Sequence, residues 1–83
     1  MSGQLPLTVA VVPLGARAEI RVTLDDFRGE PRADVRTWAD YMVGPDECRG
    51  PTRKGVSLPL AKLRGLRQAL DDLDAEARAL GLL

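Results

Sequence analysis

The feature that most constrains the fold is an alternation of polar and apolar residues whose phase reverses across a two-residue turn. Between residues 17 and 27 the odd positions are mostly polar and the even positions 20, 22 and 24 are apolar. This period of two is typical of a strand with one buried face. After Arg28-Gly29 the charged residues occupy the even positions from 30 to 36. A two-residue hairpin loop explains the reversal, because it brings the polar positions of both strands to one face.

The hairpin loop also predicts the register of the two strands. A slip by one residue would turn every charge toward the core, so one register is strongly favoured. The predicted pairs on the polar face are Phe27 with Glu30, Asp25 with Arg32, Thr23 with Asp34, Arg21 with Arg36 and Glu19 with Trp38. Those on the apolar face are Leu24 with Ala33, Val22 with Val35 and Ile20 with Thr37.

Two further strands are expected around this hairpin. Residues 7–12 form a β-branched run that Pro13 and Gly15 end as a turn. Residues 41–51 contain two Gly-Pro breaks and are predicted to be a loop, followed by a short strand over residues 53–58. Val56 and Leu58 of that short strand would face inward.

The C-terminal quarter of the chain predicts one long amphipathic helix. Pro59 suits a first helical turn, and Gly81 is a plausible stop. Gly65 interrupts the helix at a cost of about 1 kcal/mol relative to alanine, which suggests a bend or a close backbone contact. The apolar stripe recurs at spacings of three and four, at Leu60, Leu63, Leu66, Leu70, Leu73, Ala77 and Leu80. The expected fold is therefore one α+β domain over residues 1–83, with a sheet over about 7–58 and a helix over about 59–80.

Length and charge limit the function. A chain of 83 residues buries only about 60 to 65% of its unfolded surface, so oligomerisation would be a natural source of stability. Twelve Lys and Arg balance twelve Asp and Glu, whereas proteins that bind nucleic acids are usually basic. A single cysteine and an apolar run too short for a membrane span favour a soluble, cytoplasmic protein without disulfides or membrane contact.

The sequence offers little for catalysis. It has no histidine, one cysteine (Cys48) and no glycine-rich phosphate loop, so we expect no enzyme activity, no metal site and no cofactor. An acidic cluster in the helix is interpreted as a solvated face, because its side chains radiate around the helix. The cluster consists of Asp71, Asp72, Asp74 and Glu76.

The remaining candidates are cations and rings on or near the polar face of the sheet. Such groups suit a single-stranded nucleic acid, because cations bind its backbone phosphates and aromatic rings stack on its bases. Gly55 would allow a bulge through which Arg53 and Lys54 reach the same phosphates. A mixed-charge surface, with Arg32 paired to Asp25, explains the same pattern, and from pattern alone it is the favoured alternative. The candidates are Arg21, Phe27, Arg28, Arg32, Arg36, Trp38, Arg53 and Lys54.

Three motifs resemble the positive-cofactor-four family of transcriptional coactivators. They are Asp26-Phe27-Arg28-Gly29, Asp34-Val35-Arg36 and the segment from Thr52 to Pro59, followed by a terminal helix. The resemblance runs from about Ile20 to the end of the helix.

This resemblance implies a curved four-stranded antiparallel sheet and one helix, assembled as a homodimer that binds single-stranded DNA or unwound duplex. It implies a stacking role for Phe27 and phosphate contacts for Arg28 and Arg36. Arg53, Lys54 and Gly55 would form a phosphate-binding turn. Leu63, Leu66, Leu70 and Leu73 would serve the core and the dimer contact.

Three residues depart from the family pattern. Asp25 and Glu30 stand where the family tends to be basic, and Ala39 stands where it usually has an aromatic residue, which Trp38 replaces one position away. We therefore expect weaker DNA binding than is typical of the family.

The hypothesis is sequence-nonspecific binding of single-stranded DNA by a homodimer in transcription or DNA maintenance. RNA is a second candidate ligand, the transcription machinery a candidate partner, and the nucleoid the expected location in a bacterium. The alternative is a dimeric protein-interaction module that keeps the fold with a weakened nucleic-acid site.

Overall fold

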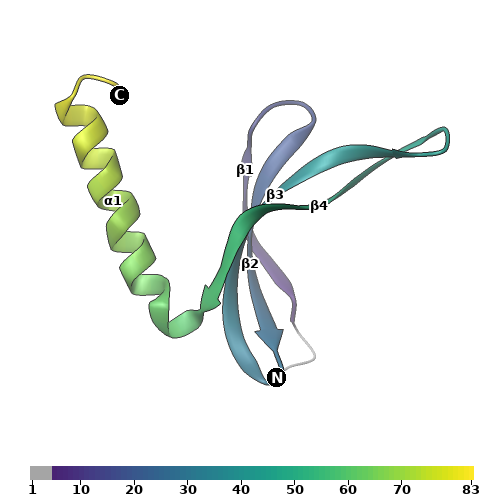
Figure 1. Ribbon diagram of the computed structural model, residues 1–83, viewed down its shortest axis with the longest axis horizontal. Coiled ribbons are helices and arrows are strands. Elements are labelled where there is room, and N and C mark those ends of the chain that lie inside the picture. The colour runs from purple at the N-terminus through teal and green to yellow at the C-terminus, as the bar shows by residue number, and fades with distance from the viewer. Residues whose placement is uncertain (1–4) are drawn as a thin grey trace.

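The computed structural model describes residues 5–83 and shows an open antiparallel sheet followed by a helix that stands beside it (Figure 1). The four strands lie in sequence order, β1-β2-β3-β4. The predicted α+β class and the order of elements are confirmed. The elements are β1 (Leu7–Pro13), β2 (Ala18–Phe27), β3 (Glu30–Val43), β4 (Asp46–Pro59), the 3-10 turn η2 (Leu60–Lys62) and α1 (Leu63–Ala79).

The hairpin between β2 and β3 has the predicted register at all eight pairs, from Phe27 with Glu30 to Glu19 with Trp38. Its two loop residues, Arg28 and Gly29, have φ angles of 54° and 84°. Two consecutive positive φ angles define the type I′ turn, whose twist matches that of the flanking strands. The polar and apolar residues of both strands are thus separated onto opposite faces.

The predicted loop over residues 41–51 is wrong, because β3 and β4 continue through it as a long hairpin. The hairpin turns only at Gly44-Pro45, where Gly44 has a φ of 60°, and in Figure 1 it projects beyond the other two strands. The second Gly-Pro pair does not break the strand because β4 is an edge strand, where proline is tolerated. A Cβ on Gly50 would lie 2.8 Å from Cε1 of Tyr41, so the glycine leaves room for that ring.

The helix does not cover the apolar face of its own sheet. Pro59 ends β4 instead of opening the helix, and no residue of α1 is buried. Among the described residues the buried apolar core is Ala33 alone, at 4% exposure, while Leu70 and Leu73 are 55% and 64% exposed. Gly65 has no atom within 4 Å of the position of a Cβ, so the close contact that it suggested does not exist within one chain.

The molecule is extended for its length. Its radius of gyration is 15.5 Å, whereas a compact domain of this size has about 12 Å. Within residues 5–83, no helix is long and apolar enough to cross a membrane.

Candidate nucleic-acid interface

The structure places the predicted site residues along the polar face of the sheet and at two of its edges. Arg21 in β2 pairs directly with Arg36 in β3, so both side chains share one face, and Trp38 follows on the same face of β3. Phe27 and Arg28 lie at the β2–β3 turn, about six residues, or roughly 20 Å, along β3 from Arg36. A ligand must therefore extend along β3 to meet both regions.

The β2–β3 turn presents a ring and a cation to solvent. Phe27 is 58% exposed, and the guanidinium carbon of Arg28 lies 5.2 Å from the centroid of its ring. A non-glycine residue with positive φ, such as Arg28, is strained by about 1 to 3 kcal/mol, and residues with such strain are found preferentially at functional sites.

The Arg53-Lys54-Gly55 segment forms part of a bulge in β4. Arg36 pairs with Gly55 and Trp38 pairs with Pro51, so residues 52–54 lie opposite the single residue Thr37. The bulge is held by Thr52, whose hydroxyl donates to the Thr37 carbonyl at 2.8 Å and accepts from the Lys54 amide at 3.1 Å.

Gly55 allows the two strands to approach closely beside the bulge. A Cβ at this position would lie 2.5 Å from the Val35 carbonyl oxygen and 2.7 Å from Cα of Arg36. No side chain fits there without a shift of the backbone, which gives a steric reason for the glycine.

Arg36 links the polar face of β3 to the bulge in β4. Its Nη2 lies 3.0 Å from Oδ1 of Asp34, and its Nη1 donates to the Thr52 carbonyl at 3.1 Å. The guanidinium is therefore both paired with a carboxylate and tied to the first residue of the bulge.

Arg21 lies over the Trp38 ring, with its guanidinium carbon 3.8 Å from the ring centroid. Its Nε donates to Oε2 of Glu19 at 2.6 Å. The predicted cation is thus fixed by an aromatic face and a carboxylate.

Arg49 is a central residue of this face that the sequence analysis missed. It donates to Glu19, to Oδ1 of Asp40 at 2.7 Å and to the Ala16 carbonyl at 3.0 Å. Hydrogen bonds from Arg21 and Arg49 hold the pKa of Glu19 below its ordinary value, and that from Arg49 does the same for Asp40. These two carboxylates in turn raise the pKa of Arg49. The sequence gives no signal for Arg49, because two Gly-Pro pairs within residues 41–51 are typical of a loop.

The cations at the two edges remain available. Within residues 5–83, the side chains of Arg28, Arg53 and Lys54 form no ion pair. The alternative pairing of Arg32 with Asp25 does not form either, since Arg32 donates to the hydroxyl and carbonyl of Ser57 at 3.2 Å. The described part of the chain contains no group of acidic or cysteine side chains arranged to hold a metal ion.

Comparisons with known proteins point to one family. The model of the family described as Transcriptional Coactivator p15 (PC4) matches residues 14–69. Two crystal forms of BPSL1147, a PC4 homolog from Burkholderia pseudomallei K96243, are 30% and 29% identical, with TM-scores of 0.71 and 0.70. Each covers 83% of this chain, which in turn covers 89% and 97% of the two neighbours.

A more distant neighbour shares the fold. It is the bacteriophage T5 homolog of the eukaryotic transcription coactivator PC4 implicated in recombination-dependent DNA replication. It is 19% identical with a TM-score of 0.55, and the match covers 88% of this chain and 82% of the neighbour. A search of curated proteins finds no match.

Proposed function

Because the chain belongs to the PC4 family of transcriptional coactivators, we propose that it binds single-stranded DNA as a homodimer, without sequence preference, in transcription or DNA maintenance. The observation that carries the proposal is the set of unpaired cations beside an exposed ring: Arg28 next to Phe27 at the β2–β3 turn, and Arg53 and Lys54 in the β4 bulge. Nonspecific binding of single strands needs this combination of cations along the backbone and rings for the bases.

The zero net charge of the chain does not oppose this proposal. Most of its arginines on the polar face are neutralised within the chain, for example Arg36 by Asp34 and Arg49 by Asp40. The charge that remains for a ligand comes from the cations of the turn and the bulge and from Arg32, which is bound only to neutral groups of Ser57. A phosphate group is attracted by the local positive charge near it more strongly than by the net charge of the whole chain.

The exposed apolar surface supports the homodimer. The chain has 6655 Å² of accessible surface, whereas a folded monomer of 9.0 kDa has roughly 4,900 Å². The excess of roughly 1,800 Å² per chain is in the range of the large apolar interfaces of obligate dimers. The exposed apolar side chains include Val9 and Val56 of the sheet and Leu70 and Leu73 of α1.

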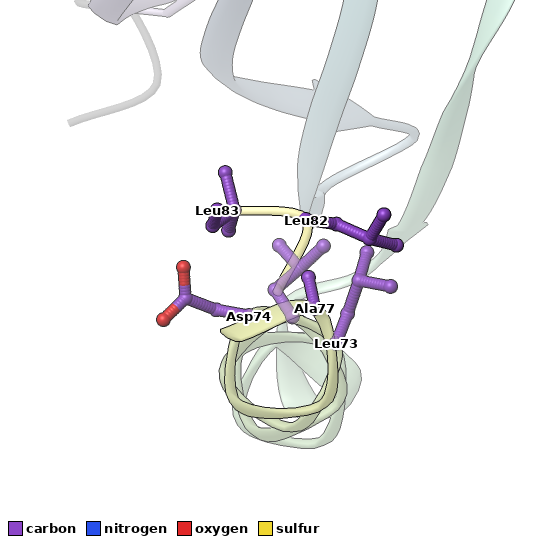
Figure 2. Close-up of a pocket in the computed structure, with 6 residues that line it drawn as sticks. Leu73, Asp74, Ala77, Leu82 and Leu83 are labelled. Carbon is purple, nitrogen blue, oxygen red and sulfur yellow. The ribbon is translucent and has the colours of Figure 1, made fainter. Parts of the chain in front are cut away.

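The C-terminal end of α1 adds to this apolar surface. Leu82 and Leu83 turn back over the helix beside Leu73 and Ala77 (Figure 2), and together with Leu70 and Asp74 they line an open groove of about 510 Å³. A second copy of the chain, which carries the same stripe, would fill it by two-fold symmetry.

A fluorescence anisotropy titration with a labelled thymine-rich oligonucleotide tests the DNA proposal. We expect binding to single strands, weaker binding to the same sequence as duplex, and a steady loss of affinity with added salt. The double variant Arg53→Ala/Lys54→Ala should bind several-fold more weakly and with a shallower salt dependence.

The matched control is Lys62→Ala/Arg64→Ala, which removes the same two charges from the exposed start of the helix and should bind like the wild type. Absence of binding at micromolar protein would contradict the proposal. It would favour the alternative, a protein-interaction module that keeps the fold. The carboxylates that neutralise Arg21 and Arg36 are compatible with this alternative, because they weaken the attraction of both arginines for phosphate.

A further inference from the structure

We propose that Arg21 and Trp38 act as one stacking platform, in which a nucleobase lies on the outer face of the Arg21 guanidinium while its inner face rests on the indole. The inference depends on the proposed binding of single-stranded nucleic acid. It gives Arg21 a role that differs from that of a phosphate-binding cation.

The first argument is the geometry of the pair. The guanidinium carbon lies over the Trp38 ring, 3.8 Å from the ring centroid, which is the contact distance of a guanidinium stacked on an aromatic face. Arginine stacks on aromatic faces in this way. Bases of single strands in turn stack on guanidinium planes as well as on rings.

The second argument is that the guanidinium is held in place. Its Nε donates to Oε2 of Glu19 at 2.6 Å, and the other oxygen of Glu19 accepts from Arg49. Arg49 is itself anchored to Asp40 at 2.7 Å. A base would therefore meet a plane whose orientation is already fixed, which reduces the entropy that binding must overcome.

The third argument is the balance of charge. Arg21 and Arg36 lie directly opposite one another on neighbouring strands, an arrangement that is unfavourable for two unpaired cations. Each is neutralised by the carboxylate two residues before it, Glu19 and Asp34 respectively. A neutralised guanidinium attracts phosphate weakly, but its plane remains available.

The candidate nucleic-acid interface therefore has two kinds of contact residue. Arg28, Arg53 and Lys54 offer charge to phosphates, and the Arg21–Trp38 pair offers a plane to a base. The side chain of Arg21 is 27% exposed, so part of it is accessible to a ligand. The indole beneath it is only partly exposed.

Two other roles for Arg21 make different predictions. Arg21 could be a lid that a base displaces in order to stack directly on Trp38, or a purely structural cation that balances Glu19. The variant Arg21→Lys separates these roles from the platform, because lysine keeps the charge, the ion pair and the attraction to the ring but has no plane. Arg21→Ala removes the whole group.

The experiment is a titration of the full-length wild type, Arg21→Lys and Arg21→Ala with a thymine oligonucleotide at several salt concentrations. Anisotropy gives the affinity, and the emission of Trp38, the single tryptophan of the chain, reports whether a base reaches the indole. Urea denaturation of each variant shows that it is folded under the conditions of the titration.

The platform predicts that Arg21→Lys weakens binding by roughly fivefold or more, the effect of losing one stacked base, with the salt dependence of the wild type retained. Arg21→Ala should also bind more weakly, and its Trp38 emission should be quenched more strongly at saturation because a base can then contact the ring. Wild-type affinity in Arg21→Lys would overturn the platform in favour of a structural cation. Equal or tighter binding by Arg21→Ala would overturn it in favour of a lid.

The wild type distinguishes failure of this inference from failure of the proposed function. If the wild type does not bind the oligonucleotide, both are overturned. If it binds and loses affinity in Arg53→Ala/Lys54→Ala but not in Arg21→Lys, the proposed function stands and only the platform is overturned.

Discussion

Arg28 has a backbone conformation that other residue types adopt more readily than arginine. Its φ of 54° is the left-handed region that the first loop position of a type I′ turn requires, where asparagine, aspartate and glycine are preferred. An arginine at this position is strained, yet it brings a cation over the exposed Phe27 ring, with its guanidinium carbon 5.2 Å from the ring centroid. Under the proposed function, the strain at this position is offset by the contact of Arg28 with the ligand.

We predict that Arg28→Asn stabilises the protein by about 0.5 to 1 kcal/mol while it weakens binding to single-stranded DNA several-fold. Asparagine adopts positive φ with less strain but carries no charge for the phosphate. Urea denaturation and anisotropy measure the two effects. Arg28→Lys is the control, since it keeps both the charge and the strain; a loss of stability in Arg28→Asn would contradict the argument.

Gly55 tests the close approach of β3 and β4 beside the bulge. A methyl group at this position would lie 2.5 Å from the Val35 carbonyl oxygen, and backbone atoms cannot give way as a flexible side chain can. We predict that Gly55→Ala costs about 1 to 3 kcal/mol of unfolding free energy and displaces the bulge with its two cations.

The comparison for this variant is Gly65→Ala in the first turn of α1. A Cβ there meets open space within the chain, and alanine favours the helix by about 1 kcal/mol over glycine. Denaturation midpoints should therefore move in opposite directions. Equal losses in both variants would contradict the steric role of Gly55.

The strand face of several candidate site residues is predictable from the sequence, but their side-chain contacts are not. Regular alternation placed Arg21, Arg36 and Trp38 on one face, as the structure confirms. It could not show that Arg21 lies over Trp38, since that depends on rotamers and on Glu19 two residues earlier on the same strand. Arg49 was missed because its partners become neighbours only when β4 is extended.

At the scale of elements, hairpin registers differ in how readily the sequence reveals them. The β2–β3 register follows from alternation on both sides of a two-residue loop, which allows one solution. The β3–β4 hairpin lacks this signal, because Gly50-Pro51 interrupts the alternation and residues 52–54 bulge opposite Thr37. Its course depends on contacts between strands, such as that of Tyr41 with Gly50, which local patterns do not encode.

Arg49 is the link between the long hairpin and the rest of the sheet. It lies in β4 and binds Asp40 in β3, Glu19 at the start of β2 and the carbonyl of Ala16 in the turn before it. Both carboxylates have a lowered pKa in the folded protein. Their contribution to stability is therefore present at neutral pH and is lost as the pH falls through their folded pKa, below the ordinary range near 4.

We predict that Arg49→Met lowers stability at pH 7 and that the difference from the wild type shrinks as the pH falls through the lowered folded pKa values of Glu19 and Asp40, because protonated carboxyls no longer bind the guanidinium as ions. Urea denaturation of both proteins from pH 7 downward measures it. Arg78→Met is the control, because its pair with Asp74 is 67% and 53% exposed and such pairs contribute little. A difference that does not change with pH would show that Arg49 acts through packing alone.

At the scale of the whole molecule, one chain does not bury a core of its own. The helix of Figure 1 stands beside the sheet instead of on it, so most of the predicted leucine stripe does not pack on the sheet. Of the stripe, Leu60 and Leu63 line a cavity with the apolar sheet face. Folding of the isolated chain would expose more apolar surface than a small domain normally can. Stability and assembly should therefore be coupled, and unfolding should depend on protein concentration.

We predict that Leu73→Lys converts the proposed dimer to a monomer or a largely unfolded chain. Leu73 is 64% exposed in the single chain and lies in the middle of the stripe beside the groove of Figure 2. A buried leucine contributes about 1.5 to 3 kcal/mol, and two-fold symmetry applies the change twice, so dimerisation should weaken by at least about a hundredfold. Light scattering coupled to size exclusion gives the mass, and circular dichroism gives the helix content.

The control for this experiment is Ala75→Lys, two residues away on the opposite face of α1. It introduces the same charge into the same helix, among acidic residues that accommodate it, and should leave the dimer intact. If the wild type is a monomer at all concentrations, or if both variants dissociate alike, the stripe is not the dimer contact. If only Leu73→Lys dissociates and also loses affinity for single-stranded DNA, the two sheets of the dimer act together on one ligand, because a monomer retains Phe27, Arg28 and the β4 bulge but offers them once.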